Sequence, residues 1–233
     1  QAAEFFLKVL DINPQHSGAK YDMAIIKKDM GLLEESKRYL QEILTSDKDN
    51  ANAAISLANV FIEIGKYHAA INSLRHIIKV SSKNRTLVHH LGLCLVTIGK
   101  FKEGWKAIES LWEKEDKESS YWYRKAKSVW NGKHTTKGIV LWKRGQGIGE
   151  DIIFLSLVPE VKEMCNMLSV YVDPRLQELC KRAMPDINFV KDIEELQDIE
   201  CDYHLPLGSV PGLIRNDISD FDRTVKGYLK ADP

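Results

Sequence analysis

The chain has 233 residues, of which 44% are hydrophobic, enough to bury one large core or two ordinary ones. Its 33 lysines and arginines balance 33 aspartates and glutamates, so the zero net charge gives no general attraction toward nucleic acid or anionic lipid. No apolar run approaches the roughly 20 residues that cross a bilayer. We therefore expect neither a nucleic-acid partner nor a membrane span.

The four cysteines lie far apart, with no CxxC motif and no Cys/His spacing that would bind zinc; they are Cys94, Cys165, Cys180 and Cys201. The first residues show neither the basic nor the apolar segment of a secretory signal. The chain opens on Gln1 in what reads as the middle of a helix. We expect a reduced, cytoplasmic protein without a metal site, cut at both ends.

Three glycines, Gly31, Gly65 and Gly99, stand 34 residues apart. Self-similarity at such a period is typical of repeat architectures. The same register, extended backward, finds Phe6 and Pro14 where the second helix of an earlier repeat would have them. The predicted units are a partial repeat over 1–16 and full repeats over 17–50, 51–84 and 85–118.

Each repeat predicts two helices. Small residues recur at one position of the first half, at Ala24, Ala58 and Gly92. Large apolar residues recur in the second half at two positions three residues apart, which is the spacing of a buried helical stripe. They are Leu40, Leu74 and Ile108, followed by Ile43, Ile77 and Leu111.

The period, the glycine at the helix corner and the pattern of small and large residues resemble the tetratricopeptide repeat family over residues 1–118. Two aromatic residues that the family has in the first helix are replaced by Lys20 and Lys27. Stacked repeats of this family form a concave surface of first helices that binds peptides. In the family register this surface presents Tyr21, Lys28, Asn52, Asn59 and His89, with Ile25, Ile55, Leu93 and Val96 beside them.

The resemblance implies a protein or peptide partner, with whose backbone Asn52 and Asn59 would form hydrogen bonds. The alternative is that all these side chains are ordinary packed or solvated helix residues. His89 and His90 are adjacent and cannot share one helical face, so we expect no metal ion there.

The period stops near Gly132, because the segment after it reads as a strand. We assign residues 119–136 to an aromatic-rich junction between two domains. The aromatic side chains either pack as a cap on the last repeat or form a platform for a ligand. They are Trp105, Trp112, Tyr121, Trp122, Tyr123 and Trp130.

Residues 137–233 alternate between short β-like runs and helical patterns, which predicts a mainly parallel sheet. The first strand, 138–142, leads into a glycine-rich turn and a helix, a geometry in which backbone amides face an anion. The glycine spacing matches neither the dinucleotide fingerprint nor the P-loop. Further strands are expected at 168–172, 187–190 and 202–205, with a helix from Pro174 capped by Asp173.

The order of landmarks after residue 121 resembles the tetratricopeptide-linked, heptosyltransferase-like glycosyltransferases of bacteria. The landmarks are Trp130-Asn131-Gly132, Ile139-Val140-Leu141, the run from Gly145 to Glu150, Pro159, the run from Pro206 to Pro211 and the run from Gly227 to Pro233. The resemblance implies a GT-B fold of two Rossmann-like halves. The first half, which meets the acceptor, would be this chain's; the second, which holds most of the nucleotide-sugar donor, would follow Pro233. The expected fold is therefore an α solenoid followed by an α/β Rossmann-like half-domain.

In this family the glycine loop ends in Gly-Asp, and the aspartate is a candidate general base toward an acceptor hydroxyl. This chain has Glu150 and Asp151 there, which would alternatively be helix N-terminal residues favoured by the macrodipole. Residues around the loop would contact a phosphate or sugar, or else be solvated flanks. They are Lys143, Arg144, Gly145, Gln146, Gly147 and Gly149.

Two functions remain open. In the first, the protein is a glycosyltransferase whose repeats recruit a protein or glycan acceptor; this fragment, which would bind no cofactor, is then inactive alone. In the second, the protein is a non-enzymatic scaffold whose repeat groove binds an extended peptide. Binding of a nucleotide-sugar by the full-length protein separates the two.

Overall fold

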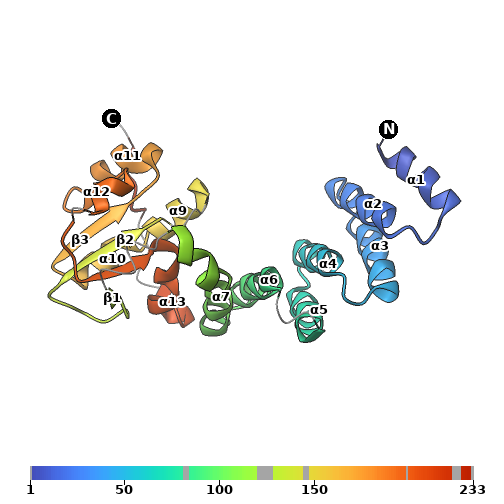
Figure 1. Cartoon of the computed structure of the whole chain (residues 1–233), viewed down its shortest axis with the longest axis horizontal. Helices are drawn as coiled ribbons and strands as arrows, with labels where there is room; N and C mark the ends of the chain where they lie inside the picture. The colour runs from blue at the N-terminus through green and yellow to red at the C-terminus, as the bar shows by residue number, and fades with distance from the viewer. Residues whose placement is uncertain are drawn as a thin grey trace. The chain divides into compact units, whose positions relative to one another are not determined.

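The computed structural model describes residues 2–80, 84–119, 128–143, 147–197, 199–221 and 227–231. It divides into two compact units, Gln1–Trp112 and Glu113–Pro233 (Figure 1). The division falls within one helix, α7 (Phe101–Ser119). Each unit is described by itself below.

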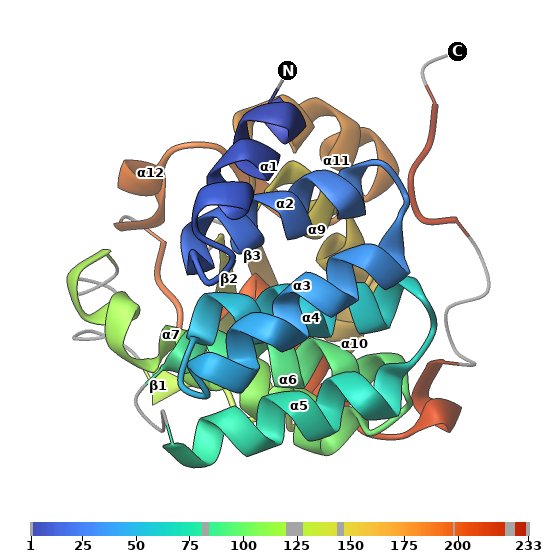
Figure 2. The same ribbon diagram turned by 90° about the vertical axis from the view of Figure 1, so that its right-hand side faces the viewer.

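The first unit is a stack of helices, each packed on the next in chain order (Figures 1 and 2). The helices before α7 are α1 (Ala2–Ile12), α2 (Ser17–Asp29), α3 (Leu33–Ser46), α4 (Ala51–Glu63), α5 (Tyr67–Val80) and α6 (Arg85–Thr97). The predicted two helices per repeat and the helical solenoid are confirmed. No described helix is long and apolar enough to cross a membrane.

The three periodic glycines end the first helix of each repeat in the left-handed region, with φ of 75° at Gly31, 74° at Gly65 and 79° at Gly99. At each, the amide of the next residue donates to a carbonyl five residues back, as Leu32 does to Lys27 at 2.8 Å. This pattern is the Schellman motif, which satisfies the carbonyls at a helix end. Only glycine adopts this conformation without steric cost. The turn therefore requires a glycine at the same position of each repeat, which explains the 34-residue spacing of the three glycines.

A second periodic feature stands at the start of each first helix, where one side chain accepts a hydrogen bond from the amide three residues on. His16 Nδ1 accepts from Ala19 N at 3.0 Å, Asn50 Oδ1 from Ala53 N at 3.0 Å, and Asn84 Oδ1 from Leu87 N at 3.4 Å. These N-caps recur every 34 residues, just as the glycines do. Cap and glycine together set the length of the first helix.

Two ion pairs join helices α2 and α3. They lie at the two positions where the resemblance to tetratricopeptide repeats predicts aromatic residues. Lys20 is only 7% exposed, and its Nζ lies 2.9 Å from Glu42 Oε2 on α3. Lys27 Nζ lies 2.8 Å from Glu35 Oε2, again between α2 and α3. Charged contacts therefore join α2 and α3 at both positions.

The second unit contains a five-stranded, wholly parallel sheet in the order β1-β5-β2-β3-β4. The strands are β1 (Ser128–Val129), β2 (Gly138–Trp142), β3 (Met167–Tyr171), β4 (Asn188–Val190) and β5 (Tyr203–Pro206). The α-helices between and after them are α9 (Ile148–Leu155), α10 (Val158–Glu163), α11 (Gln177–Ala183), α12 (Ile193–Gln197) and α13 (Val210–Ile214). The expected parallel sheet is present.

Side chains of β2 alternate between two apolar clusters, as the pleat requires. Ile139 and Leu141 join the larger cluster, which takes buried residues from α9, α10, α11 and α13. Val140 and Trp142 join the smaller cluster on the other face, which contains Leu196 of α12. The sheet therefore has helices on both faces.

The segment assigned to the junction contributes to the sheet. Its strand β1 pairs with β5, and Trp130 is 2% exposed in the larger cluster, where its indole N–H donates to the Lys133 carbonyl at 2.9 Å. This favours packing over a ligand platform at Trp130. Tyr121, Trp122 and Tyr123 lie outside the described residues.

Gly92 of α6 and Gly104 of α7 form a close helix contact in the first unit. A Cβ on Gly92 would lie 2.7 Å from Ile108 Cγ1 and 2.8 Å from the Gly104 carbonyl oxygen. We predict that Gly92→Ala destabilises the solenoid by about 1–3 kcal/mol through this overlap, despite the higher helix propensity of alanine. Urea denaturation measures it, with Lys102→Ala on exposed α7 surface as the control. An unchanged or higher unfolding free energy would contradict the packing.

Candidate functional site

A cavity of about 220 Å³ lies at the start of the first helices α2 and α4. Two predicted groove residues, Tyr21 and Asn52, line it together. The Tyr21 hydroxyl lies 3.0 Å from Ser56 Oγ on α4, which holds the ring against the next repeat. The other lining residues are Ser17, Gly18, Asp22, Ile43 and Asn50.

The other predicted groove residues do not line this cavity. Lys28 Nζ lies 3.8 Å from Glu63 Oε1, an ion pair from α2 to α4. Asn59 is half-buried on α4. His89 is half-buried on α6, with its ring centroid 6.0 Å from that of His90 and the two planes at 84°. Of the predicted groove residues, Tyr21 and Asn52 therefore are the two that line this cavity.

The second candidate site lies at the carboxyl ends of β2 and β3, where parallel strands bring the following residues to one edge. Lys143, directly after β2, is the centre of a charged cluster. Its Nζ lies 2.8 Å from Asp173 Oδ2, after β3, and 3.4 Å from Asp151 Oδ2 on α9. Asp173 also accepts from Arg175 Nε at 2.8 Å.

The two aspartates differ in environment. Asp151 is only 1% exposed, and this burial raises the pKa of its carboxyl, although the nearby Lys143 ammonium opposes the shift. Hydrogen bonds from Arg175 and from Lys143 hold the pKa of Asp173 far below its usual range. Burial disfavours the charged form of Lys143, but its contacts with Asp173 and Asp151 outweigh this and raise the Lys143 pKa. The cluster is therefore ionised at neutral pH around Lys143 and Asp173.

Glu150 and Asp151 are neighbours on α9 with different roles in the fold. Glu150 is exposed, and its Oε2 accepts a hydrogen bond from the Gly147 amide at 3.2 Å, which caps the helix. Asp151 points into the protein toward Lys143. Of the two predicted bases, only Glu150 is exposed to solvent.

Gly147 and Gly149 have no atom within 4 Å of the position that a Cβ would occupy, and neither has a positive φ. Neither backbone conformation nor packing therefore requires glycine at these positions. The bare backbone leaves the start of α9 open on that side. Arg144, Gly145 and Gln146 of the same predicted loop lie outside the described residues.

The sequence pattern predicted Asp173 only as a helix cap and gave no role to Arg175. Asp173 does accept from the Arg175 amide at 3.1 Å, so the cap exists, but the same carboxylate also binds Lys143. The sequence feature that could have indicated this contact is that Lys143 and Asp173 each follow a predicted parallel strand. Two such residues meet at the same edge only if the strands are neighbours, which the pairing of β2 with β3 establishes.

The Cys180 thiol, which is buried, and the Tyr228 hydroxyl, which is partly buried, are poor nucleophiles. Burial, with a contribution from the Asp151 charge, raises the pKa of the Cys180 thiol to about 11. Burial, with the neighbouring Cys180, raises the pKa of Tyr228 to about 12. Among the residues that the structure describes, no three His, Cys, Asp or Glu side chains gather in a way that could hold a metal ion.

These observations define a helical-repeat unit followed by a unit with a small parallel sheet. Residues 51–84 match the family model described as "Tetratricopeptide repeat". This match covers one of the three predicted full repeats and agrees with its predicted bounds. No curated protein matches the chain.

Solved structures similar to this chain include helical-repeat proteins. A crystal structure of MamA is 21% identical, with a TM-score of 0.43 over 48% of this chain and 62% of that one. YrrB, described as a TPR protein with an unusual peptide-binding site, is 16% identical, with a TM-score of 0.42 over 52% of this chain and 62% of that one. This chain thus spans less than two thirds of either protein's length.

An O-GlcNAc transferase mutant from Thermobaculum terrenum is also similar, at 16% identity and a TM-score of 0.42. The match covers 82% of this chain and 37% of that one.

The Asp173 contacts predict a pH-dependent contribution to stability. Because the folded-state pKa of Asp173 is lowered, its ionised form stabilises the fold above its unfolded pKa, and this contribution is lost as the pH falls below about 4 toward the folded value. Asp173→Asn should therefore lower the unfolding free energy at pH 7, and the difference from the parent should shrink at pH 3. Urea denaturation at both pH values measures it.

The exposed Asp186 of the same unit offers a matched control, since Asp186→Asn should have little effect at either pH. A difference for Asp173→Asn that is equal at pH 7 and pH 3 would show that the carboxylate charge contributes nothing.

Proposed function

We propose that this chain is a protein-binding module whose first helices bind an extended segment of a partner protein. The observation that carries the proposal is the cavity that Tyr21 and Asn52 line between consecutive repeats. The match of residues 51–84 to the tetratricopeptide repeat model supports the same reading. A protein or peptide is therefore the expected partner.

The cavity suits a peptide because it combines a fixed ring with an exposed amide. The contact with Ser56 Oγ holds the Tyr21 ring before a partner arrives, which lowers the entropy lost on binding. Asn52 is exposed, and its side chain offers both donors and an acceptor, the complement of a peptide backbone. Ile43 adds an apolar surface for a partner side chain.

Peptides selected on the whole chain from a phage-displayed random library test this site. We predict that Asn52→Ala weakens their binding by about fivefold for each hydrogen bond that the amide makes, because each lost hydrogen bond costs roughly 1 kcal/mol. Asn72→Ala is the matched control, since Asn72 is exposed on the second helix α5 and does not line the cavity. Fluorescence anisotropy measures both affinities. Equal affinities for the parent and Asn52→Ala would exclude this cavity as the binding site.

We further propose that the second unit is a Rossmann-like half-domain and the acceptor half of a GT-B glycosyltransferase. Support comes from the strand order β4-β3-β2-β5. After β2, the strands β3 and β4 are added on one side of it, and β5 is then added on its other side, parallel to the rest, so the direction of addition reverses between β2 and β5. Ligands of open parallel sheets bind outside the carboxyl ends of strands at such a point. Gly147, Gly149 and the start of α9 follow β2 at that edge.

In this proposal Glu150 is the general base and Asp151 a positioning residue. Glu150 is the accessible carboxylate at the start of α9, where an acceptor hydroxyl would approach over Gly147 and Gly149. Asp151 is buried against Lys143 and fixes the helix relative to β2. The base accepts the hydroxyl proton as the oxygen attacks the sugar carbon of a nucleotide-sugar, and the nucleoside diphosphate leaves.

The test uses this chain together with the donor half that the proposed transferase requires. We predict that Glu150→Gln lowers sugar transfer about 10²-fold or more while the protein stays folded, because a glutamine oxygen still caps Gly147 but accepts no proton. The measurement is release of nucleoside diphosphate from a panel of nucleotide-sugars. Glu163→Gln, at an exposed position on α10, serves as the control.

Undiminished transfer by Glu150→Gln would remove Glu150 from catalysis. Absence of both transfer and nucleotide-sugar binding in the parent, with peptide binding retained, would favour the non-enzymatic scaffold.

A further inference from the structure

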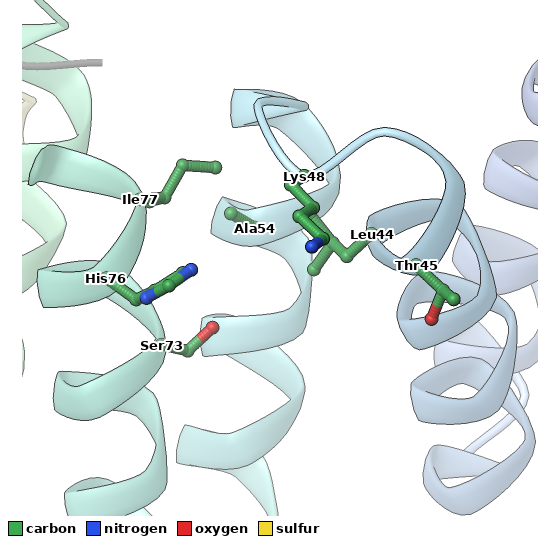
Figure 3. Close-up of a pocket in the computed structure, with 7 residues that line it drawn as sticks. All are labelled: Leu44, Thr45, Lys48, Ala54, Ser73, His76 and Ile77. Carbon is green, nitrogen blue, oxygen red and sulfur yellow. The ribbon is translucent and has the colours of Figure 1, made fainter. Parts of the chain in front are cut away.

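A second cavity, of about 330 Å³, lies on the second-helix side of the first unit and shares no residue with the Tyr21 cavity. Figure 3 shows Ser73, His76 and Ile77 of α5 on one side, residues at the end of α3 on the other, and Ala54 of α4 between them. The residues from the α3 side are Leu44, Thr45 and Lys48. Its volume is near the lower end of the roughly 300–1,000 Å³ range of ligand pockets.

The 34-residue register explains why this space is open. Ala54 and His76 occupy the positions that Lys20 and Glu42 have in the preceding repeat. There the long Lys20 side chain is buried and pairs with Glu42 at 2.9 Å, which fills the position between the two helices. In the second repeat a methyl group replaces the lysine chain, so the equivalent position is not filled.

The lining has the chemistry of an anion site with an apolar floor. Ala54 and Ile77 are buried, whereas Lys48 and His76 are exposed at the rim. Within the described residues neither Lys48 nor His76 has an ion-pair or hydrogen-bond partner. None of the lining residues is acidic.

Two acidic residues flank Lys48 in sequence, and the carboxylate of one of them, Asp47, is occupied within its own loop. It accepts from the Asp49 amide at 3.3 Å and from Asn50 Nδ2 at 3.0 Å. At the rim, the Lys48 ammonium and the His76 ring N–H are hydrogen-bond donors, and the ring keeps a donor in either protonation state. Within the described residues, no hydrogen bond or ion pair joins either donor to a carboxylate of the protein.

We propose that this cavity is a binding site for an organic carboxylate with a short apolar chain. The carboxylate accepts from Lys48 and His76, with Ser73 as a further donor, and the apolar chain lies on Ala54, Leu44 and Ile77. The group is either a free organic acid or a glutamate side chain of a partner protein. The site does not depend on peptide binding at Tyr21, because the two cavities are separate.

The test follows amide chemical shifts of the whole chain by NMR during titration with hexanoate and, separately, with its neutral isostere hexanamide. Hexanoate should shift the amide signals of Ala54, Ser73 and His76 in a saturable way, at least about tenfold more tightly than hexanamide. The second arm compares the blocked tripeptide acetyl-Ala-Glu-Leu-amide with its glutamine counterpart. Preference for hexanoate identifies a free acid as the source, and preference for the glutamate peptide identifies a protein partner.

Two variants test the geometry. Lys48→Gln combined with His76→Gln removes the charge and should weaken the tighter carboxylate probe by at least about tenfold. Ala54→Lys combined with His76→Glu copies the Lys20–Glu42 pair of the first repeat, keeps the fold by that precedent, and should abolish binding. Lys79→Gln, exposed on α5 but outside the lining, is the matched control and should bind normally.

Three results would overturn the proposal: no saturable shift with either carboxylate, equal affinity for carboxylate and amide probes, or unchanged binding by a folded Ala54→Lys/His76→Glu variant. None of these outcomes affects peptide binding at the Tyr21 cavity, which the Asn52→Ala comparison tests by itself.

Discussion

The left-handed glycine that ends each first helix is the constraint on which the solenoid depends. A helical hairpin buries its apolar stripes only if the chain reverses at a fixed point, and Gly31, Gly65 and Gly99 place that reversal at the same position in every repeat. The N-caps at His16, Asn50 and Asn84 fix the other end of the first helix. Helix length is therefore set at both ends, and residues 34 apart occupy equivalent places.

Equivalent places with different residues produce the two cavities of the solenoid. Lys20 and Ala54 share one place, yet the first fills the space toward the second helix and the second leaves a cavity. Tyr21 is tied to Ser56 across a repeat boundary and lines a different cavity. Cavities here thus arise from local variation on a repeated backbone frame. The sheet unit uses a different device, a charged cluster in which Lys143 joins the residues after β3 to α9.

The sequence predicted most of the solenoid because glycine at positive φ and small residues at tight helix contacts have few substitutes. The caps were harder to predict, since histidine is an unusual N-cap and only Asn50 and Asn84 resemble each other. Strand β1 has two residues, too few for any periodic pattern, and it is recognisable only through its pairing with β5. The parallel sheet followed from alternation of strands and helices.

Side-chain contacts between distant residues account for what the sequence could not predict of the candidate sites. The ion pair between Lys143 and Asp173 requires that β2 and β3 be neighbours. The cavity at Ala54 arises because a small side chain leaves space unfilled, and no sequence motif indicates such a space. Glu150 and Asp151 looked equivalent as carboxylates, but consecutive helix residues point about 100° apart, so the first lies in solvent and the second points inward. Burial, more than residue type, separates their roles.

A crystal structure of this chain with a peptide selected for binding to it is the most direct measurement of where the repeats hold a partner. Protein binding through the first helices predicts an extended peptide over the cavity between α2 and α4, with the Asn52 side chain bonded to its backbone and the Tyr21 ring against one of its side chains. A peptide seated wholly on the second helices, with the Tyr21 cavity empty, would contradict it.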